Sequence, residues 1–188
     1  MFSSSTAQPA TPRKTGFPGP RREFEARGHT VIVPQFPTPE GQSVAAWMAS
    51  LDVYRPQINS NTILIGHSLG GLFMLRLLES LGAPVAASVF VGAPIGVRPL
   101  SNYDRDSEFS QGFEFDWAKI RQNAGRVIVF HSDNDPYVSL SNGQELAREL
   151  GVELTFVPGA GHFSTRTGGY TEFPLLLEKL DQEILNER

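Results

Sequence analysis

The chain has 188 residues, of which 40% are hydrophobic and 19% charged, a composition typical of one globular domain with a sizeable core. Its formal net charge of -4 offers no basic surface for nucleic acid, and no apolar run approaches the roughly 20 residues that span a bilayer. With no cysteine, disulfides, thiolate metal ligands and a cysteine nucleophile are excluded, which suits the cytoplasmic location that we expect.

Residues 1–21 differ in composition from the rest of the chain. They contain no acidic residue and combine serine, threonine and four prolines with basic residues. This composition lacks the apolar core of a secretory signal, and proline disfavours an amphipathic targeting helix. We therefore expect residues 1–21 to be a disordered or atypical segment, with a targeting peptide as the alternative, and residues 22–188 to form the folded domain.

From residue 22 onward, runs typical of strands alternate with runs of helical periodicity. The expected strands are 29–34, 61–66, 86–94, 126–132 and 152–159. The expected helices are 22–28, 42–58, 69–82, 115–125, 141–151 and part of 170–187, with a loop at 95–115. Because several of these strands are apolar on both faces, the pattern predicts an α/β fold. We expect a three-layer sandwich, in which a mostly parallel sheet carries helices on both faces.

The sequence Gly66-His67-Ser68-Leu69-Gly70 joins the second expected strand to the helix that follows. A G-x-S-x-G turn presents its serine on a strained bend above the sheet, and Gly66 and Gly70 leave the room that this bend needs. The main-chain N–H of Leu69, at the helix start, would face an oxyanion. The motif predicts Ser68 as a nucleophile, with an idle serine in a tight turn as the alternative. A phosphate-binding loop is disfavoured because Gly-Lys-Ser/Thr is absent.

A serine nucleophile needs a base, and the sequence offers four histidines in different contexts. His162 lies in a glycine-rich loop after the last expected strand, and we predict that it is the base. His29 is expected at the surface. His67, beside the serine, is expected to give packing or hydrogen-bonding support, and His131 is expected to pack at a strand end.

The base in turn needs a carboxylate that orients it, and the segment HSDNDP offers two. We predict Asp135 in this role and Asp133 as a turn-forming residue. The chain order Ser68, Asp135, His162 is that of α/β-hydrolases. We expect neither a metal nor an organic cofactor. The acidic segment 104–116 does not match an EF-hand loop and is expected to be solvated.

The chain resembles the small lidless serine hydrolases of the α/β-hydrolase superfamily, which include the YdeN-like and retinoblastoma-binding-protein-type hydrolases. The segments that carry the resemblance are VPQFPTPEGQSVAAWMASL, ILIGHSLGG, FDWAKI, VFHSDNDPYV and GAGHF, in that order. The resemblance implies a compact α/β-hydrolase fold and a triad of Ser68, Asp135 and His162. It also implies a small-molecule acyl substrate, most simply an ester, with amides and thioesters as further candidates.

The resemblance breaks at the front of the chain. Members of this family begin with an apolar strand ending in His-Gly, whose loop supplies the second oxyanion donor. We find no such strand before residue 22, although in the family's topology it would lie between the strands expected at 29–34 and 61–66. The second donor is therefore unassigned. An alternative stays open, in which the chain is a catalytically impaired hydrolase-fold protein that binds a partner.

Overall fold

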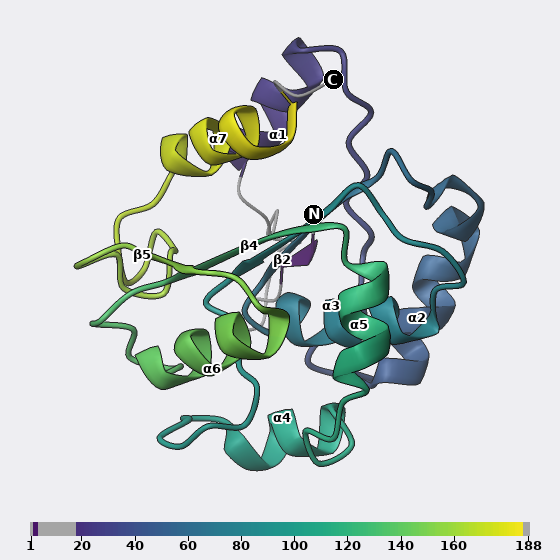
Figure 1. Cartoon of the computed structure of the whole chain (residues 1–188). Coiled ribbons are helices and arrows are strands. Elements are labelled where there is room, and N and C mark those ends of the chain that lie inside the picture. Colours follow the sequence, from purple (N-terminus) through teal and green to yellow (C-terminus); the bar gives the residue numbers. More distant parts are fainter. Residues whose placement is uncertain (1, 4–17, 186–188) are drawn as a thin grey trace.

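A computed structural model of the protein describes residues 2–3 and 18–185. Its centre is a five-stranded sheet in the order β1-β2-β3-β4-β5, and each neighbouring pair is parallel (Figure 1). The strands are β1 (Phe2–Ser3), β2 (Ile63–His67), β3 (Ala87–Val91), β4 (Arg126–His131) and β5 (Leu154–Phe156). All five residues of β3 are buried, as in a central strand that helices cover on both faces. The predicted parallel α/β fold is confirmed.

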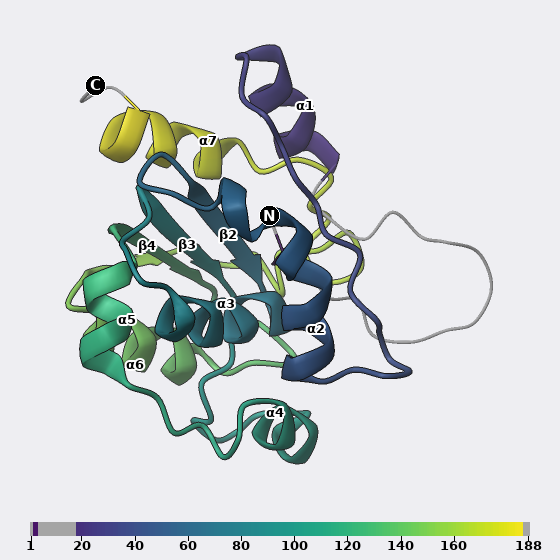
Figure 2. The same ribbon diagram turned by 90° about the vertical axis from the view of Figure 1, so that its right-hand side faces the viewer.

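Helices cover both faces of the sheet and so make three layers (Figure 2). On one face lie α1 (Pro18–Ala26) and α7 (Pro174–Leu180), which a π-helical turn (Asp181–Leu185) extends. On the other face lie α2 (Val44–Leu51), α3 (Leu69–Ser80), α5 (Trp117–Asn123) and α6 (Leu140–Leu150). None of the described helices is both long and apolar enough to cross a membrane.

The expected helices 42–58 and 69–82 fold as the local signals predict, with shorter bounds. Ser43 caps α2 by accepting a hydrogen bond from the N–H of Ala46, and a 3-10 helix (Asp52–Gln57) follows. The α3 helix is buried along most of its length. Its fully buried apolar side chains are Leu72, Phe73, Met74, Leu75, Leu77 and Leu78.

The expected loop 95–115 contains a short helix, α4 (Tyr103–Phe109). Tertiary contacts hold this helix: the Phe109 ring lies 5.0 Å from that of Trp47, and Arg76 donates to the carbonyl of Ser110. The expectation that 104–116 is a solvated loop was wrong, because Asp106 and Ser110 are buried. A helix of seven residues is too short to be stable alone, so its local sequence gives little signal.

The front of the sheet differs from the sequence prediction in two respects. A strand of two residues does precede residue 22, since β1 pairs with Gly66 and His67 at the carboxyl end of β2, but it is not the strand ending in His-Gly that the family has. Residues 29–34 form no strand. Between them and β2 lies a cavity of about 460 Å³, lined on the sheet side by residues 62–65. Within the described residues, the segment 29–34 lines the cavity and does not join the sheet. Most of the 1–21 segment lies outside the described residues.

Candidate active site

Four loops meet at the carboxyl edge of the sheet, where open parallel sheets place their ligand sites. Ser68 directly follows β2, and Gly92 directly follows β3. Asp135 lies in the loop after β4, and His162 lies in the loop after β5. The topology thus brings together the three residues that the sequence predicts as nucleophile, acid and base.

Ser68 stands on a strained turn between β2 and α3. Its φ of 55° and ψ of -126° are unusual for a residue with a side chain and cost about 1–3 kcal/mol. Its N–H donates to the carbonyl of Val91, 2.9 Å away, which ties the turn to β3. A Cβ added to Gly66 would lie 2.7 Å from Cα of Gly71, so strand and helix cross too closely for any side chain there. Gly71, which the five-residue motif does not include, therefore completes this turn together with Gly66.

The start of α3 offers a donor for a negative charge. The N–H of Leu69 has no acceptor among the described residues, as is usual in the first turn of a helix. The N–H groups of Gly71 and Leu72 both donate to the carbonyl of Ser68. The predicted oxyanion donor is thus available beside the serine, where the helix dipole also favours an anion.

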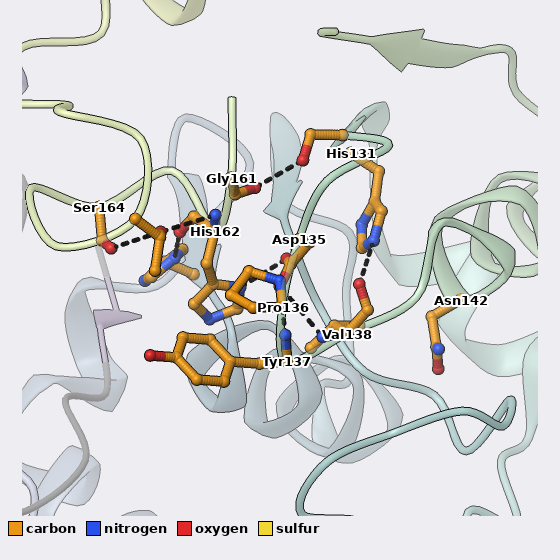
Figure 3. A network of polar contacts seen from close by, with 12 residues as sticks. His131, Asp135, Pro136, Tyr137, Val138, Asn142, Gly161, His162 and Ser164 are labelled. Carbon is orange, nitrogen blue, oxygen red and sulfur yellow. Dashed lines mark hydrogen bonds and ion pairs between the residues drawn. The ribbon is translucent and has the colours of Figure 1, made fainter. Parts of the chain in front are cut away.

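The predicted base and acid form a short, buried pair (Figure 3). Nδ1 of His162 lies 2.6 Å from Oδ2 of Asp135, whose side chain is fully buried. Burial alone would raise the pKa of Asp135. The hydrogen bond and charge of His162, with the N–H groups of Tyr137 and Val138, outweigh burial and lower that pKa. An ionised Asp135 that accepts from Nδ1–H leaves Nε2 of His162 free to accept a proton.

No hydrogen bond joins Ser68 Oγ to His162 within the part of the chain that the structure describes. Such contacts commonly tighten only when substrate is bound, so the open geometry is compatible with catalysis. The Tyr137 ring packs edge-on against His162, with centroids 5.1 Å apart. This contact limits the rotation of the imidazole.

The loop that carries Asp135 also holds the loop that carries His162. Ser132 Oγ donates to the carbonyl of Gly161 at 2.6 Å, and Asn134 Oδ1 accepts from the N–H of Gly161 at 2.7 Å. Asp133 Oδ1 accepts from the N–H of Gly159, so the predicted local turn at Asp133 is not formed. The turn forms at Asp135 instead. Its Oδ1 accepts hydrogen bonds from the N–H groups of Tyr137 and Val138.

The other three histidines lie as predicted. His29 is exposed. His131 is fully buried, with Nε2 3.0 Å from the carbonyl oxygen of Val138, and burial lowers its pKa (Figure 3). His67 is buried beside the serine, and its Nε2 lies 2.8 Å from the carbonyl oxygen of His162. Burial, and then the neighbouring His162, lower the pKa of His67 to about 3.

Gly92 belongs to the site although no role was predicted for it. Its φ is +54°, and an added Cβ would lie 3.3 Å from Nδ1 of His162 and 3.4 Å from Oδ2 of Asp135. A side chain at this position would press on the hydrogen bond between the two residues. The available signal was the segment GAP directly after a buried strand, at the same edge as the other loops.

A strained serine after one strand and a buried acid–base pair on two neighbouring loops are the arrangement of an α/β-hydrolase. The model of the serine hydrolase family matches residues 25–182, and the chain belongs to that family. Within the described residues, no group of histidine and carboxylate side chains could hold a metal ion.

The chain is similar to proteins described as hydrolases. The chain is 29% identical over 177 residues to the putative hydrolase YdeN of Bacillus subtilis (strain 168), covering 91% of this chain and 89% of YdeN. It is 27% identical over 150 residues to serine hydrolase RBBP9 of Rattus norvegicus, covering 80% and 75%. The crystal structure of the B. subtilis ydeN gene product matches with a TM-score of 0.78, 29% identity and 86% of each chain. The predicted resemblance to YdeN-like and retinoblastoma-binding-protein-type hydrolases is confirmed.

A more distant structure shows the same fold. MGS-MChE2, an α/β-hydrolase enzyme from the metagenome of sediments from the lagoon of Mar Chica, Morocco, matches with a TM-score of 0.61 at 22% identity. The match covers 89% of this chain and 84% of that one.

Proposed function

We propose that this chain hydrolyses small esters with Ser68 as nucleophile, His162 as general base and Asp135 as the orienting carboxylate. The observation that carries the proposal is the 2.6 Å bond between His162 and the buried Asp135, on loops that meet the strained Ser68 turn. The Ser68 backbone conformation costs free energy, and such strain is typical of functional sites.

The reaction follows from this geometry. Ser68 Oγ attacks the ester carbonyl while Nε2 of His162 takes its proton, and Asp135 stabilises the imidazolium that forms. The N–H of Leu69 stabilises the oxyanion of the tetrahedral intermediate. His162 then gives the proton to the departing alkoxide, which leaves as the alcohol. Water attacks the acyl-serine by the same steps and releases the carboxylic acid.

The proposal favours esters over amides because one oxyanion donor is identified in the described residues. Each missing donor costs about 10²–10³ in rate, and an alkoxide leaves far more readily than an amine. Activated esters with short acyl chains are therefore the substrates on which activity should first be visible, with thioesters next. We place this activity in a reducing compartment such as the cytoplasm, which the lack of cysteine suits.

The test is the hydrolysis of p-nitrophenyl acetate and butyrate by the parent chain, Ser68→Ala, His162→Ala and the control His29→Ala. We expect each site variant to lose at least about 10³-fold in kcat/KM, while the control, at an exposed histidine, keeps the parent rate. Hydrolysis that survives in Ser68→Ala would remove Ser68 from the mechanism.

A second candidate is a hydrolase-fold protein that binds a partner without catalysis. The cavity of about 460 Å³ beside β2 favours it, because the sheet is incomplete there within the described residues. A parent chain that is folded by circular dichroism but hydrolyses none of these esters would support this candidate.

A further inference from the structure

We propose that His67 is a positioning residue, which holds the loop of the general base against the strand that carries the nucleophile. The inference rests on the proposed function of Ser68 and His162. It assigns a task to a residue beside the reacting groups that takes no part in the proposed proton transfers.

The first observation is the direction of the hydrogen bond between His67 and His162. Nε2 of His67 lies 2.8 Å from the main-chain oxygen of His162. A carbonyl oxygen can only accept, so Nε2 of His67 must carry a proton. This bond leaves the His162 imidazole untouched and fixes the backbone from which that imidazole projects.

The second observation is where the other restraints on this loop come from. The N–H of His162 donates to Thr167 Oγ1, which belongs to the same loop region, at 2.8 Å. The loop that carries Asp135 (the acid loop) binds both main-chain groups of Gly161: Ser132 donates to its carbonyl, and Asn134 accepts from its N–H. These bonds set the base relative to the acid. The bond from His67 instead joins the His162 backbone to β2, the strand that ends directly before Ser68.

The third observation is that His67 and Ser68 are consecutive residues at the end of β2. Residues Ile63 to His67 are held in register against β3, so the His67 ring has little freedom to move along the strand. Its side chain is buried, and its ring centroid lies 4.7 Å from that of His162. One strand end therefore sets both the position of Ser68 Oγ and the position of the backbone of His162.

The burial of His67 also keeps this restraint intact at working pH. A buried imidazole is held neutral, and here its pKa is lowered to about 3. A neutral ring with its proton on Nε2 keeps donating to the carbonyl. It also adds no positive charge beside His162 when that imidazole becomes protonated during the reaction.

The test compares His67→Phe, which keeps a ring but removes the donor, with His67→Gln, whose amide nitrogen can donate at nearly the same place. The control is His29→Phe, the same change at an exposed histidine. For His67→Phe we expect kcat on p-nitrophenyl acetate to fall about 10- to 100-fold, since a misplacement of 1 Å costs up to about 100-fold. KM should change less than about threefold, because the buried His67 is proposed to position the base and not to bind the ester. His67→Gln should recover most of kcat.

Two outcomes would overturn the proposal. One is a His67→Phe variant with the parent's kcat. The other is an equal loss of kcat in both His67 variants together with an equal fall in melting temperature, which would indicate a merely structural role. NMR spectra of the imidazole groups separate this inference from the proposed function. If the parent hydrolyses no ester, the His162 resonances should still shift in His67→Phe and stay near the parent's in His67→Gln; unshifted resonances would overturn the positioning role.

Discussion

Replacing Gly92 by alanine tests whether the acid–base pair needs the space that this glycine leaves. The added Cβ would lie 3.3 Å from Nδ1 of His162 and 3.4 Å from Oδ2 of Asp135, so the pair must recede by a few tenths of an ångström. Because a displacement of 1 Å costs up to about 100-fold in rate, we expect kcat to fall on the order of tenfold. The φ of +54° adds a folding cost of about 1–2 kcal/mol.

The control that separates the two effects is Gly151→Ala. Gly151 ends α6 with a φ of +72°, and an added Cβ there meets nothing within 4 Å. Urea denaturation should show a similar loss of stability in both variants, and ester hydrolysis should fall only in Gly92→Ala. A Gly92→Ala enzyme that keeps more than half of the parent's kcat would refute the reasoning, because the pair could then yield without consequence.

Three further predictions concern charge and buried polar groups. Asp135→Asn should lower kcat about 10⁴-fold. The variant should also have a lower free energy of unfolding than the parent at neutral pH. This difference should shrink as the pH falls below about 4, because a carboxylate with a lowered pKa stabilises the fold only while it is ionised. Urea titrations at several pH values measure this difference in the free energy of unfolding, and a difference that stays constant down to pH 2 would contradict the prediction. Unfolded His67 binds a proton near pH 6.5 and folded His67 only near pH 3. The contribution of His67 to the free energy of unfolding should therefore fall by about 1.4 kcal/mol for each unit by which the pH is lowered between these values. His67→Gln should flatten that slope, and an unchanged slope would remove His67 as its cause. Asn142 is fully buried and binds Ile95 and Val97, so Asn142→Leu should cost about 2–4 kcal/mol; an unchanged melting temperature would refute this.

The nucleophile turn, the base loop and the acid loop could be predicted because each is encoded locally. Glycine at position 66 permits the close crossing of strand and helix, and HSDNDP and GAGHF follow apolar strands. The parallel topology then places all three at one edge of the sheet. Of the two aspartates in this segment, Asp135 is the one that binds His162, and its role as the orienting carboxylate stays a prediction.

The features that were missed depend on contacts distant in sequence. Residues 29–34 have a strand's composition, but within the described residues they line the cavity beside β2 and do not join the sheet. The α4 helix depends on packing against Trp47 and on a bond from Arg76. The role of Gly92 arises only because two later loops fold over it.

The most direct test of the central claim is labelling of the purified chain with a fluorophosphonate probe, followed by intact-mass and peptide analysis. The account predicts one probe per chain, attached to Ser68, with no labelling of Ser68→Ala and strongly slowed labelling of His162→Ala. A chain that is folded by circular dichroism and takes up no probe, or that is still labelled after Ser68→Ala, would contradict an activated serine at this site.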